Sequence, residues 1–266
     1  MICYICTSNY RQMERKFNLA FNIFLVAGML VALTLTTVFK LQQPGARAFM
    51  LLLAAFGAMM GIINTVLSAN GHILTFVFGF IDVLVATVVC FENGIMGNFA
   101  LHAFYFLPMQ FVGFWQWRKR GASLDSEGGT SKLKPRRLTS RQWTWLAVGI
   151  VAGIVILFFI LYLVDKAQLS AGRITDINKP KILLDATVMT LNIAGQVLLS
   201  FAFMEQWYIW ILVNISSISL WAVALASGTG SGNAAVMLVK YIFYLLNSLN
   251  GLRIWLNLSR KAYLDN

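Results

Sequence analysis

The sequence contains few charged residues: only 12% of its 266 residues are Asp, Glu, Lys or Arg. Soluble globular domains carry about 25% charged residues. Because 59% of the residues are hydrophobic and the mean hydropathy is +0.72, there is too little polar surface to cover a water-exposed domain. These values argue against a soluble enzyme. They predict an all-α integral membrane protein of about eight transmembrane helices, since each span needs about 20 mostly apolar residues.

Histidines and cysteines are scarce as well, numbering 2 and 3. The spacing of Cys3 and Cys6 resembles half of a metal site, but no second Cys or His pair follows at a suitable distance. His72 and His102 lie in or beside apolar runs. A membrane enzyme would need His, Asp or Glu clustered at one membrane face. We therefore expect no metal, no cofactor and no catalytic centre.

Eight apolar runs predict the transmembrane helices, and breaks rich in Gly, Pro and Asn separate them. The expected helices cover residues 17–39, 49–67, 74–91, 95–117, 143–164, 182–203, 206–226 and 234–256. The formal net charge of +11 comes from Lys and Arg that mostly flank these runs. This pattern indicates topology signals and contacts with anionic lipid, rather than nucleic-acid binding.

The basic stretch 118–142 predicts the orientation of the chain, because loops rich in Lys and Arg stay in the cytoplasm. With eight spans, both termini fall on the same side as this loop. We therefore expect a multi-pass protein of the bacterial inner membrane with cytoplasmic N- and C-termini.

The three spans before the fifth resemble the three after it. Asn64 and Gln196, Ser68 and Ser200, and Asp82 and Asn214 are each separated by 132 positions. The motifs Gly113-x-x-x-Trp117 and Gly251-x-x-x-Trp255 are 138 apart, and a Gly/Ser insertion at 227–232 accounts for the difference of six. On the charge assignment, the two repeats run in the same direction, as in the SWEET sugar transporters.

The repeat predicts a 3+1+3 arrangement with an additional first helix. Residues 1–47 form an N-terminal tail and that additional helix, and residues 48–120 form the first three-helix repeat. Residues 121–181 hold the basic cytoplasmic loop, the linker helix and an external loop. Residues 182–266 form the second repeat and the C-terminal tail.

Polar side chains within the spans are candidates for a solute site, because polar groups in hydrocarbon usually face the bundle interior or a pathway. Most are amides, which suit a neutral or weakly cationic solute with hydroxyls and a carboxamide. A proton relay needs a series of Asp, Glu or His, so only Asp82 keeps that alternative open. The predicted solute contacts are Asn64, Gln110, Trp117, Asn192, Gln196, Trp210, Asn214, Tyr244 and Asn247.

Each of these residues also has a structural interpretation. A single amide more often forms an interhelical hydrogen bond than a ligand contact. Aromatic residues near span ends favour an interfacial belt, and we expect this for Trp143, Trp145, Trp207 and Trp221. For Trp117 and Trp210, which lie closer to the amides, packing and ligand contact remain equal alternatives.

Residues 48–258 resemble the PnuC family of nicotinamide riboside transporters. The segments that carry the resemblance are TLNIAGQVLL at 190–199, EQWYIW at 205–210 followed by Asn214, YLLNSLNGLRIW at 244–255 and QFVGFWQW at 110–117. The resemblance implies a SWEET-like pair of triple-helix bundles, often assembled as a homotrimer. It also implies uptake of nicotinamide riboside by facilitated diffusion, followed by trapping through phosphorylation by a cytoplasmic riboside kinase.

Two other functions remain open from the residues. Thiamine is also a planar cation, and a thiamine or other vitamin transporter of the same fold would use similar residues. The third possibility is the substrate-binding subunit of an ATP-driven uptake system, although the internal repeat favours a transporter that works alone. Because no Lys or Arg is central among the amides, we expect the phosphorylated riboside to be rejected.

Overall fold

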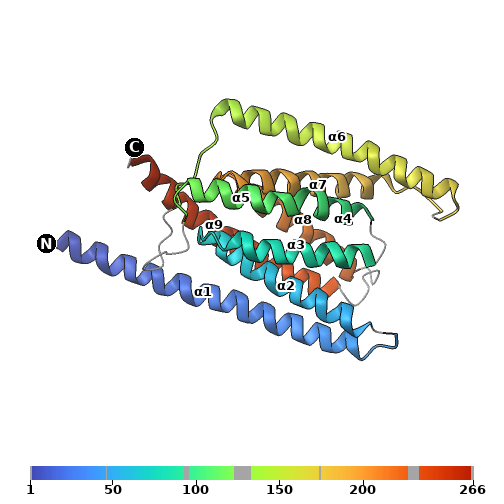
Figure 1. The fold of residues 1–266 in the computed structure, drawn as a ribbon, viewed down its shortest axis with the longest axis horizontal. Coiled ribbons are helices and arrows are strands. Elements are labelled where there is room, and N and C mark those ends of the chain that lie inside the picture. The colour runs from blue at the N-terminus through green and yellow to red at the C-terminus, as the bar shows by residue number, and fades with distance from the viewer. Residues whose placement is uncertain are drawn as a thin grey trace.

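The computed structural model describes residues 2–45, 47–92, 96–122, 133–173, 175–226 and 234–264, and within these residues it is all-helical (Figure 1). The helices are α1 (Ile2–Leu41), α2 (Ala48–Ala69), α3 (Thr75–Glu92), α4 (Met96–Leu101), the π-helical turn η1 (His102–Phe106), α5 (Leu107–Lys119), α6 (Ser140–Ser170), α7 (Lys179–Ser200), α8 (Gln206–Ala226) and α9 (Ala234–Leu264). Each predicted span coincides with one helix, the fourth with α4, η1 and α5 in succession. The predicted eight-helix membrane fold is confirmed.

The helices extend beyond the predicted spans where polar residues continue a helix without a Pro or Gly break. The first span was expected to begin at residue 17, but α1 already begins at Ile2. Five of the described helices, namely α1, α2, α3, α6 and α7, are long and apolar enough to cross a bilayer by composition. At 1.5 Å per residue, the 22 residues of α2 span about 33 Å, close to the thickness of the hydrocarbon layer.

The fourth span contains a π-helical turn for a local reason. Pro108 stands at the second residue of α5, and it has no backbone N–H to donate to the preceding turn. The backbone N–H of Leu107 bonds to the carbonyl of His102, five residues earlier, which widens the helix at this point. Such widened turns often occur at functional sites.

Two three-helix bundles form the centre of the molecule. The first contains α2, α3 and the α4–α5 span, and the second contains α7, α8 and α9. The bundles meet where α2 packs on α9 and α5 packs on α7. Helix α1 lies against α2 and α9 on one side, and α6 lies against α7 on the other (Figure 1).

One end of this helical bundle holds the start of α1, the end of α9, and the connection from α5 to α6 (Figure 1). We call it the terminal end. Helices α2 and α7 both run toward it, so the two bundles are parallel as the sequence predicted.

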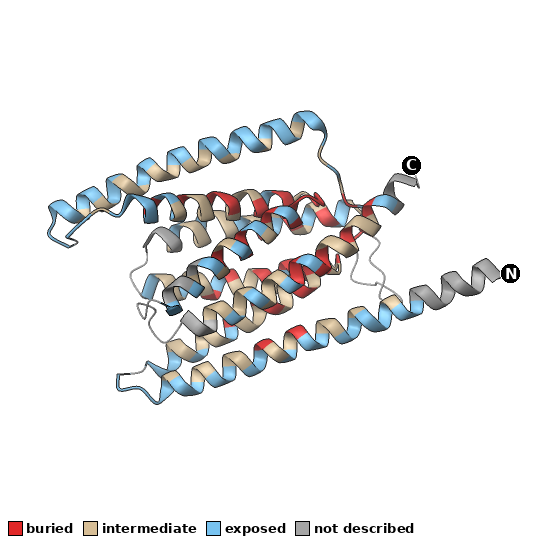
Figure 2. Cartoon of the chain, turned by 180° about the vertical axis from the view of Figure 1, so that it is seen from behind, coloured by how far each residue is buried: buried red, intermediate tan, exposed pale blue. Residues whose placement is uncertain are grey.

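Most buried residues lie on the helices of the two bundles, α1 adds Leu25 and Met29, and α6 has none (Figure 2). Its exposed face carries Val151, Ile156 and Phe159, which are apolar side chains suited to lipid or to another subunit. The apolar exterior, together with an interior that holds both hydrophobic clusters and polar side chains, matches a helical membrane protein.

The described end of the basic loop, residues 133–139, lies against the turn between α7 and α8. We call this segment the docked loop. The backbone N–H of Arg136 donates to the carbonyl of Ala202 at 2.7 Å, and the N–H of Met204 donates to the carbonyl of Arg136 at 3.0 Å. The Arg136 guanidinium lies 4.5 Å from the centre of the Phe203 ring. Thr139 then caps α6 through a reciprocal pair of hydrogen bonds with Gln142.

Candidate functional site

Two tryptophans join the bundles near the terminal end, and each donates to the other bundle. The Trp117 indole N–H donates to the Leu199 carbonyl at 2.7 Å, and the Trp255 indole N–H donates to the Ser68 carbonyl at 3.0 Å. Both indoles are fully buried, and their centres are 5.3 Å apart. Trp117 and Trp255, which are equivalent in the two repeats, therefore each form a similar hydrogen bond to the opposite bundle.

Two glycines make room for aromatic rings beside this pair. A Cβ atom at Gly113 would lie 2.1 Å from the Phe76 ring, and one at Gly251 would lie 2.5 Å from the Trp207 ring. Only a residue without a side chain allows so close an approach. Phe76, Trp117, Trp207 and Trp255 form one buried cluster, which we call the aromatic plug.

The plug changes the interpretation of two tryptophans. Trp207 was expected in an interfacial belt, but it is 3% exposed within the plug, so that expectation is wrong. Its position at the start of α8 resembled a span end, but the docked loop covers this end of the bundle, and Leu133 joins the same buried cluster. Solute stacking on Trp117 stays a prediction. In this structure its indole packs against Phe76 and Trp255.

In the first bundle, the predicted residues Asn64 and Gln110 lie together across Gly79. A Cβ at Gly79 would be 2.5 Å from the Gln110 amide oxygen and 3.2 Å from the Asn64 amide. The Thr75 hydroxyl donates to both the backbone carbonyl and the side-chain oxygen of Asn64, at 2.9 and 2.5 Å. The Gln110 amide donates to the Phe106 carbonyl at 3.2 Å, next to the π-helical turn. These contacts fix the orientation of both amides.

In the second bundle, Gln196 and Trp210 lie on either side of Gly195. The Trp210 ring would be 3.0 Å from a Cβ at Gly195, so the absence of a side chain there allows the ring to approach α7. The Gln196 amide donates to the Ser200 hydroxyl at 3.3 Å. Ser200 donates in turn to the Met109 carbonyl of the first bundle, at 3.3 Å. The Gln196 amide is therefore connected to α5 through one hydroxyl.

On α8 and α9, Asn214 is connected to the backbone of Tyr244 through Ser248, and Asn247 bonds separately to α2. The Asn214 amide donates to the Ser248 hydroxyl at 3.0 Å, and Ser248 donates to the Tyr244 carbonyl at 2.8 Å. The Asn247 amide donates across the interface to the Thr65 carbonyl of α2 at 2.9 Å. Its side-chain oxygen is buried without a partner among the described residues, so it retains an unused acceptor.

Asn192 is the predicted residue least connected to the others. Its amide donates to the Val188 carbonyl of its own helix at 2.8 Å, and its side chain is half-buried. The next residue, Ile193, accepts the Tyr105 hydroxyl at 2.8 Å from the π-helical turn of the other bundle. Of the predicted amides, Gln196 and Asn247 therefore connect to the opposite bundle. Asn64, Gln110 and Asn214 have their contacts within their own bundle, and Trp117 lies near the terminal end.

Sequence reasoning missed a buried polar pair at the start of α8. Glu205 is 4% exposed and Gln206 is fully buried. One carboxylate oxygen of Glu205 and both polar atoms of the Gln206 side chain have no hydrogen-bond partner in the described part of the chain. A buried polar group without a partner costs about 1–3 kcal/mol. Their place in the EQW segment of the family resemblance was the available signal, but a helix start was the simpler interpretation.

The basic side chain of Arg253 on α9 is already engaged. Arg253 donates to the side-chain oxygen of Asn250 through Nε at 3.2 Å and through Nη2 at 2.9 Å. It also forms an ion pair of 3.4 Å with Glu14 and a hydrogen bond with Asn18, both on α1. These contacts attach α1 to the second bundle.

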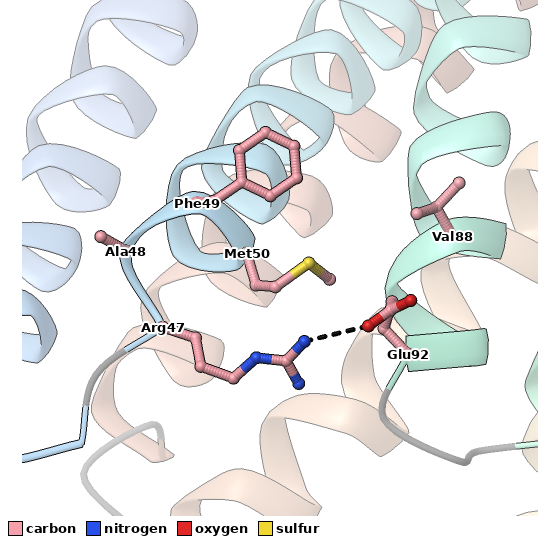
Figure 3. Close-up of a pocket in the computed structure, with 6 residues that line it drawn as sticks. All are labelled: Arg47, Ala48, Phe49, Met50, Val88 and Glu92. Carbon is pink, nitrogen blue, oxygen red and sulfur yellow. Dashed lines mark hydrogen bonds and ion pairs between the residues drawn. The ribbon is translucent and has the colours of Figure 1, made fainter.

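A pocket of about 370 Å³ lies at the opposite end of the molecule, between α2 and α3 (Figure 3). It is lined by Arg47, Ala48, Phe49, Met50, Val88 and Glu92. Arg47 and Glu92 form an exposed ion pair of 2.9 Å across it, drawn as the dashed line in Figure 3. None of the predicted solute contacts lines this pocket, so it is a surface feature separate from the amides.

Comparisons with known proteins identify what the chain is similar to. A family model described as nicotinamide mononucleotide transporter matches residues 51–257. The nicotinamide riboside transporter PnuC of Neisseria mucosa is 33% identical over 210 residues, covering 79% of this chain and 73% of that protein. The protein of the same name from Haemophilus influenzae is 28% identical, covering 79% and 81%. A crystal structure of the vitamin B3 transporter PnuC aligns with a TM-score of 0.62 at 30% identity, covering 90% of this chain and 92% of the other.

Proposed function

The chain belongs to the family of nicotinamide mononucleotide transporters, and we propose that it carries nicotinamide riboside across the inner membrane of a bacterium by facilitated diffusion. The observation that carries the proposal is the set of oriented amides within the two bundles, of which Gln196 and Asn247 connect one bundle to the other. Carboxamide and ribose hydroxyl groups both donate and accept hydrogen bonds, as Asn and Gln side chains do. The Trp210 ring, held beside Gly195, offers a face on which a planar cationic ring can stack.

The residues of the proposed solute site come from both bundles. Asn64 and Gln110 contribute from the first, and Gln196, Trp210, Asn214, Tyr244 and Asn247 contribute from the second. Trp117 and Asn192 border the site, because Trp117 belongs to the aromatic plug and Asn192 bonds within its own helix. The unused side-chain oxygen of Asn247 is an acceptor for a solute hydroxyl or amide.

The name of the family model and the names of the relatives point to different solutes, a mononucleotide and a riboside. A phosphate group needs a cationic side chain or a set of backbone donors. Arg253 is occupied by Glu14, Asn18 and Asn250, and the Lys240 ammonium lies over the Tyr244 ring at 5.3 Å. These engaged cations favour the riboside. Phosphorylation by a cytoplasmic riboside kinase would then trap the solute inside the cell.

Alternating access would follow from rocking one bundle against the other around the amides. The aromatic plug and the docked loop close the terminal end in this structure, and they are the elements that opening toward the cytoplasm would separate. We place the terminal end in the cytoplasm, because the basic loop 118–142 lies there. A homotrimer in the lipid bilayer would use exposed apolar faces such as that of α6.

Calorimetry on the detergent-purified protein tests the proposal. Nicotinamide riboside should bind, thiamine and riboflavin should not displace it, and the mononucleotide should bind at least tenfold more weakly. Gln196→Ala should weaken binding about tenfold, since losing one hydrogen bond at a buried site costs roughly 1–2 kcal/mol. Gln168→Ala on α6 is the matched control, and it should bind like the wild type. Unchanged affinity in Gln196→Ala would remove the central residue of the site, and binding of thiamine alone would refute the solute.

A further inference from the structure

Two opposite charges lie within the spans of different bundles: Asp82 in the middle of α3, and Lys240 on α9. A charged side chain inside the hydrocarbon layer is costly, and those that persist usually have a function. Neither residue is among the predicted solute contacts. The Asp82 carboxylate therefore needs a functional explanation.

Asp82 borders the amides of the first bundle. It lies three residues after Gly79 on the same face of α3, and Asn64 and Gln110 both approach α3 at Gly79. Its carboxylate approaches α2, where a Cβ at Gly61 would be 2.9 Å from the nearer oxygen. Asp82 is half-buried rather than fully enclosed. Its carboxylate therefore lies one turn from the amide pair, on the side away from the aromatic plug.

Lys240 faces Asp82 from the other bundle without touching it. The Lys240 ammonium lies 5.3 Å from the Tyr244 ring centre and 6.0 Å from the Tyr241 ring centre. Asp82 and Lys240 carry opposite charges and lie near enough to attract one another. No direct ion pair joins them in the described structure. Because two aromatic rings hold the ammonium, Lys240 has favourable contacts of its own and leaves the carboxylate open to another cation.

The second repeat shows that packing alone does not require a charge at this position. Asn214 is the equivalent of Asp82, and its neutral amide is satisfied by the Ser248 hydroxyl at 3.0 Å. An amide of the same size therefore fits the same place in a three-helix bundle. The carboxylate of Asp82 adds negative charge, and that charge has no close partner within the bundle.

We propose that Asp82 is the countercharge for the cationic ring of the solute, and that it selects the charged riboside over neutral molecules of the same shape. The proposal rests on the proposed function and adds a specificity-determining residue to it. In the empty site, the positive charge of Lys240 offsets the negative charge of the Asp82 carboxylate without direct contact. When the solute enters, its ring charge takes that role, and the Lys240 ammonium stays over Tyr241 and Tyr244.

The test uses two probes with the same sugar and carboxamide: nicotinamide riboside, whose aromatic ring is cationic, and its reduced dihydropyridine form, whose ring has gained a hydride and is neutral. Asp82→Asn should weaken binding of the cationic riboside about tenfold or more, since a charge pair at close range in a partly buried site is strong. Binding of the neutral form should change less than about threefold, because its contacts are unaffected. Asp185→Asn, which removes an exposed carboxylate from α7, is the matched control and should leave both affinities unchanged.

The ratio of the affinities for the cationic and the neutral riboside shows whether Asp82 acts through its charge or only through its place in the structure. An equal loss for both probes in Asp82→Asn, or no loss for either, would overturn the proposal while leaving nicotinamide riboside transport intact. Lys240→Met provides a second variant, and it should raise the preference for the cationic form. A lower preference in Lys240→Met would also overturn the proposal. Wild-type protein that binds neither probe would instead refute the proposed function itself.

Discussion

Replacing Gly113 by alanine should destabilise the protein, because it places a methyl group inside the aromatic plug. The new Cβ would lie 2.1, 2.6 and 2.9 Å from three carbons of the Phe76 ring. Carbon atoms normally approach to about 3.5–4.0 Å. The ring has little room to move, because Phe76 is 3% exposed and its centre lies 5.0 Å from that of Trp117 in an edge-to-face contact.

The size of the effect follows from two opposing contributions. Overpacking a core by one methyl group costs about 1–3 kcal/mol, and an overlap above 1 Å favours the upper part of this range. Alanine is better than glycine in a helix by about 1 kcal/mol. The net loss is about 1–2 kcal/mol, which corresponds to a melting temperature lower by about 3–6 °C for a chain of this size.

Thermal melting of the detergent-purified variants measures this difference, with Gly149→Ala as the matched control. Gly149 lies on α6, and a Cβ there would meet nothing within 4 Å. The control therefore keeps the gain in helix propensity without the clash, and it should melt at or slightly above the wild type. If Gly113→Ala melts at the same temperature as Gly149→Ala, the ring does not lie where the structure places it.

Two further substitutions test the contacts between elements. Trp255→Phe should lower the melting temperature by a few degrees and reduce uptake into liposomes. The reason is that the Ser68 carbonyl loses a buried hydrogen-bond donor worth about 0.5–1.5 kcal/mol. Trp145→Phe, at an exposed tryptophan of α6, is the control and should change neither quantity. Arg253→Ala should lower the free energy of unfolding by about 1–2 kcal/mol, since it removes hydrogen bonds to two helices. Arg47→Ala should lower it by less than about 1 kcal/mol, as expected for an exposed ion pair. Equal melting temperatures for the two arginine variants would contradict the role of Arg253 in attaching α1.

The sequence was sufficient to predict the spans and their repeat, because both depend on composition along the chain. Apolar length identifies every helix, although polar extensions such as the start of α1 lie outside the predicted spans. The fixed spacing of Gly113-x-x-x-Trp117 and Gly251-x-x-x-Trp255 identifies equivalent helices. The same spacing does not reveal which way a side chain points. Trp207 and Trp210 are one helical turn apart, yet Trp207 lies in the plug and Trp210 faces Gly195.

The parts that the sequence could not predict depend on contacts between distant segments. The docked loop covers the α7–α8 turn through backbone hydrogen bonds of Arg136, which leave no pattern in side-chain type. The Lys240 ammonium lies over the rings of Tyr241 and Tyr244, a contact that the sequence pattern does not reveal. The burial of Gln206 likewise requires knowledge of which segment lies over the start of α8.

The two repeats carry identical residues at some equivalent positions and different residues at others, and the two kinds of position lie in different parts of the bundle. Near the terminal end, equivalent residues are identical: Ser68 and Ser200, Gly113 and Gly251, and Trp117 and Trp255. The two equivalent tryptophans both donate to a backbone carbonyl of the opposite bundle, although the acceptors, Leu199 and Ser68, are not equivalent positions of the repeat.

Toward the middle of the bundle, the equivalents diverge, with Asn64 matched by Gln196 and Asp82 by Asn214. A solute such as nicotinamide riboside has no twofold symmetry, because its ring and its sugar need different partners. Two identical residues at equivalent positions would suit either the ring or the sugar of the solute, but not both. The divergence of the amides and of Asp82 is therefore what an asymmetric solute requires of a duplicated fold, and the shared plug is what closure of that fold requires.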